Sequence, residues 1–116
     1  MNRFMLKSKI KGAKVTETKL YYEGSITLDE DILEAADILP GERLEVLNIN
    51  NGARVQTYAI KGEKGSGLIC MNGPAARKAE VGDRIIILSY VTVSDEEAGS
   101  INPKKIKLDE NNRVIS

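Results

Sequence analysis

Hydrophobic residues alternate with polar ones in short stretches, which is the pattern of strands with one buried face. The longest stretch, Arg84–Val93, contains four consecutive aliphatic residues and predicts a strand at the centre of the sheet. A polar tail follows Asn102, in which Lys104–Lys107 is a candidate edge strand and whose end we expect to be loosely held. The other predicted strands cover Val15–Tyr21, Leu44–Ile49, Arg54–Ile60 and Leu68–Met71.

Turn and helix signals separate these strands. The dipeptide Asn51-Gly52 favours the positive φ angles of a tight hairpin. A helix is predicted over Glu30–Ala36, capped by Asp29 or by Thr27, because Thr27 and Glu30 have the spacing of a capping box. Two further short helical segments are predicted, Pro74–Arg77 and Ser94–Glu97.

One pattern occurs twice along the chain. Gly41–Leu47 and Gly82–Leu88 both contain glycine, an acid, arginine and then an aliphatic strand, and each follows a short segment with two adjacent alanines. A glycine beside a carboxylate suits a turn in which the acid accepts backbone N–H groups. Two such units predict a closed barrel with pseudo-twofold symmetry, since closure removes exposed strand edges. The alternative is coincidence among common turn residues.

Composition excludes several classes of function. Seventeen basic and 17 acidic residues give no net charge, which argues against nucleic-acid partners, an RNA-binding barrel included. The chain has no histidine and one cysteine, so imidazole-based catalysis, disulfides and multi-cysteine metal sites are excluded, and we expect no metal. No stretch suits a signal or membrane segment. We therefore expect one cytoplasmic domain over residues 1–116.

Gly24 and Ser25 form a dipeptide that can rearrange chemically. A serine hydroxyl aimed at the preceding carbonyl can take over its acyl group and convert the peptide bond into an ester, and glycine tolerates the strained backbone this needs. β-Elimination would then cut the chain and leave dehydroalanine, whose hydrolysis gives a pyruvoyl ketone. The same dipeptide occurs at Gly65-Ser66 and Gly99-Ser100, so on local sequence alone an ordinary turn is the better explanation.

Seven groups of residues together carry a more specific signal than any one of them alone. They are Lys9, Lys14–Thr16, Tyr22–Ser25, Asn51–Arg54, Thr57–Ile60, Asn72–Ala76 and Val81–Asp83. In order and spacing, over about four-fifths of the chain, they resemble the bacterial aspartate 1-decarboxylase family of self-processing pyruvoyl enzymes. The resemblance implies a mainly β fold, the double-psi β-barrel with short helices, which agrees with the internal repeat.

The resemblance also implies the reaction. Ser25 would become a covalent pyruvoyl cofactor after cleavage of the Gly24–Ser25 bond into fragments 1–24 and 25–116. L-Aspartate would form a Schiff base with that ketone, lose its α-carboxylate as CO2 and leave as β-alanine, a precursor of pantothenate and coenzyme A. Thr57 would stabilise the oxyanion during self-cleavage, and Tyr22 would help to position the cut bond.

Other residues receive roles in substrate binding. Two cations suit the two carboxylates of aspartate, and Arg54 offers a planar fork while Lys9 offers a point charge. Tyr58 is the candidate proton donor because histidine is absent. The alternative to these functional roles is structural: Lys9 and Arg54 would be solvated surface charges, and Tyr58 would be a half-buried aromatic residue of a strand. The residues expected to hydrogen-bond the pyruvoyl group and the substrate are Asn72, Gly73, Pro74 and Ala75, with Thr57 also at the substrate.

Three points bear on the assembly and on the departures from the family. Regular alternation would put Thr57 and Tyr58 on opposite faces of a strand, so both reach one site only if the strand bends or subunits share the site. The resemblance implies a homotetramer with sites between neighbouring subunits. Lys11 stands where many members have histidine, and Leu47 where some have tryptophan.

Two further interpretations complete the predictions. Cys70 is expected to be a small buried hydrophobic residue and not a nucleophile, because no base lies near it. The alternative to an enzyme is a small non-catalytic β-barrel that acts as an interaction or regulatory module. Such a module would stay uncut.

Overall fold

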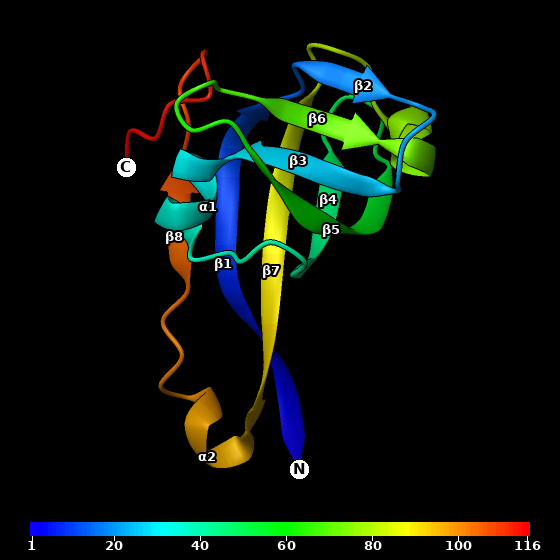
Figure 1. Cartoon of the computed structure of the whole chain (residues 1–116). Coiled ribbons are helices and arrows are strands. Elements are labelled where there is room, and N and C mark those ends of the chain that lie inside the picture. The colour runs from blue at the N-terminus through cyan, green and yellow to red at the C-terminus, as the bar shows by residue number, and fades with distance from the viewer.

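Eight strands form one curled sheet in the computed structural model, which describes residues 1–116 (Figure 1). The strands are β1 (Asn2–Lys14), β2 (Glu17–Lys19), β3 (Ser25–Asp29), β4 (Arg43–Asn48), β5 (Arg54–Gly62), β6 (Ile69–Asn72), β7 (Arg84–Ser94) and β8 (Lys104–Lys107). Two α-helices, α1 (Glu30–Ala36) and α2 (Asp95–Ala98), and the 3₁₀-helix η1 (Gly73–Lys78) complete the fold. None of these helices is long and apolar enough to cross a membrane.

The strand order explains how the sheet curls. It runs β2-β6-β3-β5-β4-β7-β1-β8, with parallel pairing in β2/β6, β3/β5 and β1/β8. The first and last parts of this order are joined by the chain itself, because β1 continues into β2 through Val15 and Thr16. Val15 N–H donates to Asp83 O at 2.9 Å, and Thr16 N–H donates to Ile69 O at 2.8 Å. Beyond the barrel, β1 and β7 run on as a two-stranded ribbon towards α2 (Figure 1).

The repeated glycine–acid pattern forms two equivalent turns. Gly41 and Gly82 have φ angles of +90° and +95°, which glycine adopts without steric cost. The Glu42 carboxylate accepts the N–H of the residue three positions earlier at 3.2 Å, and the Asp83 carboxylate does the same at 2.9 Å. These bonds, with that of Ser89 to Glu42 and that of Asn48 to Asp83, lower the pKa of both acids, although burial opposes the effect.

Each turn also pairs with one residue of a distant strand segment. Gly41 and Glu42 exchange backbone hydrogen bonds with Ala59 at 2.8 and 3.0 Å, and Gly82 and Asp83 exchange them with Val15 at 2.8 and 2.9 Å. The two turns are therefore held to distant parts of the chain by the same pattern of backbone hydrogen bonds. This confirms the predicted pseudo-twofold repeat.

Nineteen buried residues form one hydrophobic core inside the barrel. Ile26 and Leu28 contribute from β3, Ile85 and Ile87 from β7, and Ile32 from α1, all with at most 1% of their surface exposed. Burial of each such side chain contributes about 1.5–3 kcal/mol. Because Ile26 and Leu28 face the core, Ser25 and Thr27 alternate to the opposite face of β3.

Several element predictions are corrected by the structure. The strand predicted over Val15–Tyr21 shrinks to Glu17–Lys19, and Tyr21 and Tyr22 lie in the bend that follows. The helix over Glu30–Ala36 is confirmed, and its N-cap is Asp29, not Thr27, because Asp29 accepts the Asp31 N–H at 2.8 Å. In the loop between β4 and β5, only Gly52 has a positive φ, of +74°.

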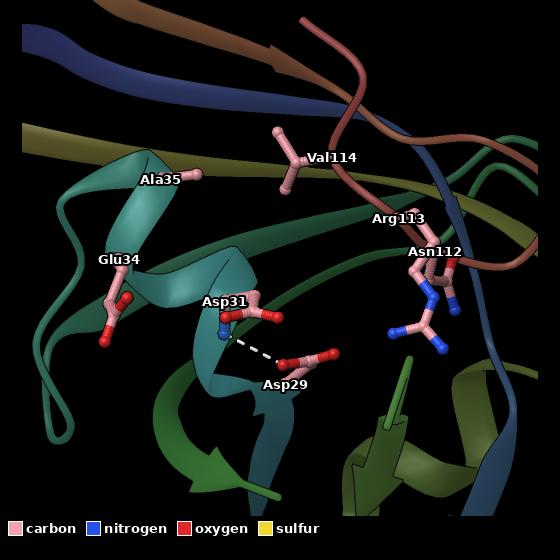
Figure 2. Close-up of a pocket in the computed structure, with 7 residues that line it drawn as sticks. All are labelled: Asp29, Asp31, Glu34, Ala35, Asn112, Arg113 and Val114. Carbon is pink, nitrogen blue, oxygen red and sulfur yellow. Dashed lines mark hydrogen bonds between the residues drawn. The ribbon is translucent and has the colours of Figure 1, made fainter. Parts of the chain in front are cut away.

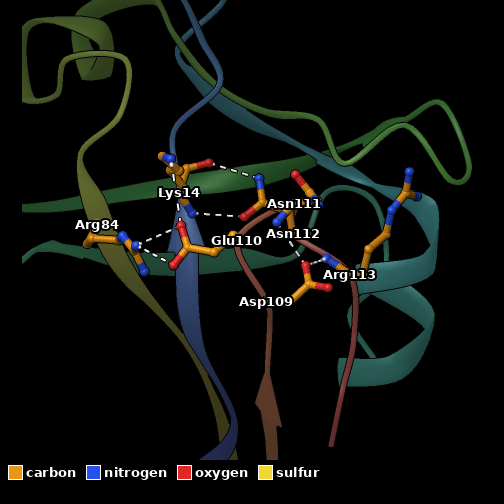
Figure 3. Close-up of polar contacts among 7 residues, drawn as sticks. All are labelled: Lys14, Arg84, Asp109, Glu110, Asn111, Asn112 and Arg113. Atoms are coloured by element: carbon orange, nitrogen blue, oxygen red, sulfur yellow. Dashed lines mark hydrogen bonds and ion pairs between the residues drawn. The ribbon is translucent and has the colours of Figure 1, made fainter.

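The expectation of a loosely held tail is wrong. Asn112 is 2% exposed, and its side chain accepts the Lys14 N–H at 3.0 Å while donating to the carbonyls of Lys14 and Gly67 at 2.9 Å each. Figure 3 shows this amide and the neighbouring pair of Arg84 with Glu110. The predicted edge strand Lys104–Lys107 is confirmed as β8. Side-chain hydrogen bonds therefore hold the tail where hydrophobic residues are few.

Candidate active site

Ser25 is the first residue of β3 and has no exposed surface. It pairs in register with Asn72 on β6. The Ser25 Oγ donates to the Glu23 carbonyl at 2.9 Å and accepts from Asn72 Nδ2 at 3.0 Å. The hydroxyl is thus held against the backbone that precedes it, and its O–H group points to the Glu23 carbonyl oxygen.

Asn72 links Ser25 to two further buried groups. Its Nδ2 also donates to Thr27 Oγ1 at 2.9 Å, and its Oδ1 accepts from Cys70 Sγ at 3.1 Å. Burial, with help from the charge of Glu17, raises the pKa of Cys70, so the thiol keeps its proton. The prediction that Cys70 is buried is confirmed, and that it is not a nucleophile stays a prediction, with which the raised pKa agrees. Its hydrogen bond to Asn72 was not predicted.

Gly73, the first residue of η1, lies in close contact with the residues just before the bond expected to be cut. Gly73 has a φ of +64°, and a Cβ at this residue would lie 2.6 Å from the Tyr22 carbonyl oxygen and 2.8 Å from the nitrogen of Gly24. Pro74 Cδ lies 3.4 Å from the position that a Cβ on Gly24 would take. The side chain of Ala75 packs in the core, so only its backbone is available to the site. Of the predicted residues 72–75, the first three therefore lie against Gly24 or Ser25.

Tyr58 lies on the strand beside Ser25. Ile26 on β3 pairs with Ala59 on β5, so Ser25 and Tyr58 are neighbours one residue earlier on these parallel strands. The Tyr58 hydroxyl donates to Glu23 Oε2 at 3.3 Å. Partial burial and the Glu23 carboxylate raise the pKa of Tyr58, which keeps the phenol protonated. Glu23, which contacts both groups, was not among the predicted site residues.

Thr57 and Tyr22 make no hydrogen bond to Ser25. Thr57 pairs with buried Leu44 and alternates with Tyr58, so the two side chains lie on opposite faces of β5. Tyr22 is 52% exposed, and its ring lies 5.8 Å from the Lys19 Nζ. Its carbonyl, in contact with Gly73, is the part that reaches the site.

Lys9 and Arg54 are not brought to Ser25 within one chain. Lys9 lies on β1, where it pairs with Leu88 and Lys105. Arg54 begins β5 and forms an ion pair with Glu45. It is four residues before Tyr58 on the strand, a distance of about 13 Å. The predicted substrate-binding cations therefore lie outside the cluster around Ser25.

A separate hollow of about 520 Å³ lies at the other end of β3 (Figure 2). The Asp29 carboxylate there accepts three backbone N–H groups at 2.8–2.9 Å, and these bonds outweigh burial and lower its pKa. Lys64 is paired with Asp31 and Glu34. The Asp29 bonds hold the turns around it and the other two acids are paired with Lys64, so we assign this hollow a structural role. No group of three His, Cys, Asp or Glu side chains suited to a metal occurs in the structure.

Comparison with known sequences provides evidence that is independent of the geometry. Residues 1–115 match the sequence model of the family described as "Aspartate decarboxylase". A protein of Thermoanaerobacter pseudethanolicus named aspartate 1-decarboxylase is 60% identical over 116 residues, which are 100% of this chain and 99% of the relative. One of the same name from Cytophaga hutchinsonii is 52% identical over 115 residues, 99% of this chain and 100% of the relative.

Solved structures support the fold alone. The computationally designed msDPBB_sym2 protein matches with a TM-score of 0.50 and 14% identity over 77% of this chain and 99% of its own. The rationally designed mkDPBB_sym_86 protein matches with a TM-score of 0.50 and 18% identity over 70% of this chain and 94% of its own. DPBB denotes the double-psi β-barrel, so the predicted fold class is confirmed.

Proposed function

Because the chain belongs to the aspartate decarboxylase family, we propose that it removes CO2 from L-aspartate to give β-alanine. The family assignment supports the substrate and the type of reaction. The way in which the chain carries out this reaction is inferred from the residues around Ser25.

The observation that carries the proposal is the buried Ser25 hydroxyl beside the Gly24–Ser25 bond, the bond that the family resemblance marks for cleavage. Its contacts to the Glu23 carbonyl and to Asn72, and the close approach of Gly73 to Gly24, hold this segment in one geometry. These residues fit a pyruvoyl group formed from Ser25, since a small group there would be buried and would face the Asn72 amide. We propose self-cleavage into fragments 1–24 and 25–116.

When formed, the pyruvoyl group supplies a ketone that condenses with the substrate amine and accepts electrons as CO2 leaves. The chain's own residues bind and protonate. Asn72 Nδ2 donates a hydrogen bond at residue 25, and Gly73 lies against Gly24, on the other side of the bond to be cut. Tyr58 keeps its proton at neutral pH and is the candidate donor to the reacting carbon, where Glu23 fixes its hydroxyl.

Substrate recognition is proposed to involve a second subunit. Lys9, Arg54 and Thr57 make no hydrogen bond to Ser25 in one chain, and Arg54 is paired instead with Glu45. A homotetramer with shared sites would bring a neighbour's cations to the α- and β-carboxylates. Exposed aromatic side chains on the outer sheet face, Phe4 at 81% and Tyr90 at 43%, are consistent with a covered surface in an assembly.

Intact mass spectrometry tests the proposal directly. The purified protein is expected to consist of fragments 1–24 and 25–116. After treatment with aspartate and borohydride, which reduces the Schiff base to a stable amine, the larger fragment should gain the mass of the attached amino acid. Ser25→Ala should remain whole and inactive. Ser100→Ala, which alters another Gly-Ser dipeptide in a surface turn, should be cut and active. A whole wild-type chain without decarboxylase activity would support the non-catalytic module instead.

Two wider roles stay predictions. β-Alanine would enter pantothenate and coenzyme A synthesis, and the protein would work in the cytoplasm. Growth of a deletion strain that recovers on added β-alanine or pantothenate would support the first, and cell fractionation would test the second.

A further inference from the structure

Cys70 and Thr27 both contact the amide of Asn72, and nothing in the proposed reaction uses either residue. We propose that they are positioning residues, which hold the Asn72 amide so that an N–H group always faces Ser25. The inference rests on the proposed self-cleavage at Ser25 and names two further residues on which that site depends.

The two strands place these four residues in a square. Ser25 pairs with Asn72, and Thr27 pairs with Cys70, on the antiparallel strands β3 and β6. Ile69 and Met71 of β6 pack in the core, so Cys70 and Asn72 alternate to the opposite face. Cys70, Asn72 and Ser25 are at most 2% exposed. Thr27, the fourth member, is partly exposed. Around Ser25, Asn72 and Cys70, little surface is therefore open to water that could replace a lost partner.

Every polar atom of the Asn72 amide has a partner within this square. Nδ2 donates to Ser25 Oγ at 3.0 Å and to Thr27 Oγ1 at 2.9 Å, and Oδ1 accepts from Cys70 Sγ at 3.1 Å. An amide nitrogen carries two donors and its oxygen none, so the partners determine which end faces Ser25.

The thiol decides the orientation of the amide. Ser25 already donates its proton to the Glu23 carbonyl, so its oxygen needs a donor from Asn72. A rotated amide would direct Oδ1 at this oxygen and Nδ2 at the thiol, which would leave the Ser25 oxygen without its donor. The Cys70 thiol donates to Oδ1 and so favours the productive orientation. Loss of the thiol leaves a buried acceptor without a partner, which is unfavourable.

The first experiment measures self-cleavage of purified, uncut precursor by intact mass against time. Cys70→Ala and Thr27→Val are expected to slow cleavage about tenfold, equivalent to about 1.4 kcal/mol in the barrier. Cys70→Ser keeps a donor and should cleave within about threefold of wild type, since a hydroxyl also donates to Oδ1. Ile69→Val is the matched control, because it removes one methylene from the core face of the same strand, and it should cleave at the wild-type rate.

The second experiment observes Asn72 itself in the uncut precursor. Hydrogen exchange of its side-chain amide, followed by NMR, should be faster in Cys70→Ala than in wild type and restored in Cys70→Ser. Wild-type cleavage and amide exchange in Cys70→Ala would overturn the proposal. So would equal slowing by Cys70→Ser and Cys70→Ala, which would indicate packing alone. If the wild-type precursor is never cut, the proposed function fails, and the exchange comparison still decides whether Cys70 positions Asn72.

Discussion

At the scale of single residues, Tyr58 has the clearest chemical role. It lies on the strand next to that of Ser25, its hydroxyl donates to Glu23, and its pKa is raised, so the phenol is protonated at neutral pH. We expect Tyr58→Phe to cut itself at the wild-type rate and to form β-alanine about 10²–10⁴-fold more slowly, the usual contribution of a positioned acid. Mass spectrometry and a β-alanine assay measure the two effects. Undiminished turnover would remove Tyr58 as the proton donor.

The contact between Glu23 and the Tyr58 hydroxyl leads to a separate prediction about the pKa of Tyr58. Its carboxylate contributes to the raised pKa of Tyr58, because a nearby negative charge disfavours the phenolate. Glu23→Gln removes the charge, so the pKa of Tyr58 should fall towards the ordinary tyrosine value of about 10. Ultraviolet titration follows all tyrosines at once. Subtracting the titration curve of the double variant Glu23→Gln/Tyr58→Phe from that of Glu23→Gln leaves the curve of Tyr58 alone. A Tyr58 pKa equal in wild type and Glu23→Gln would contradict the assignment.

Sequence indicates the residues with unusual chemistry better than those that support them. Ser25, Tyr58 and Asn72 were predicted, and the structure brings these three together. Glu23 and Thr27 were not predicted, because a carboxylate or a threonine beside a site has no distinctive spacing. Cys70 was correctly predicted to be buried, but its bond to Asn72 depends on the alternation of one strand, and the other partner of Asn72, Thr27, is 45 residues away from it in sequence. Such contacts follow from packing and not from local sequence.

At the scale of elements, the start of η1 controls the segment to be cut. An alanine at Gly73 would have to adopt a φ of +64° and would meet the Tyr22 carbonyl at 2.6 Å. Gly52→Ala is the matched control, since Gly52 has a similar φ of +74° with no atom in the way. Both changes should cost about 1–2 kcal/mol in the free energy of unfolding for the backbone conformation. Only Gly73→Ala should cost more and slow self-cleavage at least tenfold, equivalent to about 1.4 kcal/mol in the barrier.

Urea unfolding and time-resolved intact mass measure the two consequences of these glycine changes. A Gly73→Ala precursor that is cut as fast as Gly52→Ala would show that the contact with Gly24 is irrelevant to cleavage. Equal unfolding free energies would show that the loop simply moves away.

The elements that the sequence predicted correctly carry regular hydrophobic alternation. β4, β5 and β7 match closely, and so do both capped helices. β1 was missed, because lysines alternate with Ser8 and Ile10, and because two register shifts against β7 interrupt its pattern. The prediction of a strand over Val15–Tyr21 shows the opposite error, because it assigns a strand where most residues form none. Four of its seven residues lie in the link between β1 and β2 or in the bend that follows. In both places the pairing partners are distant in sequence, so local alternation misleads.

At the scale of the whole molecule, the repeat was predictable and the arrangement of the site was not. Gly41 and Gly82 mark the two halves in the sequence, and their turns make equivalent backbone hydrogen bonds to distant residues. The distance between Arg54 and Ser25, in contrast, depends on the path of β5. The opposite faces of Thr57 and Tyr58, foreseen from alternation, agree with a site that a single barrel does not complete.

A mixing experiment tests whether two chains share one site. Ser25→Ala lacks the group formed at residue 25 but keeps Arg54, and Arg54→Ala is expected to cut itself yet bind aspartate poorly. If a neighbour supplies Arg54, co-expressed variants form some sites with an intact Ser25 product from one chain and Arg54 from the other. Random assembly then restores about a quarter of the wild-type activity, since half the chains can supply each part. A site contained in one chain gives no recovery, because every chain lacks one part. Native mass spectrometry of the mixture, with the two chains distinguished by their cleavage state, confirms that mixed assemblies are present when activity is measured.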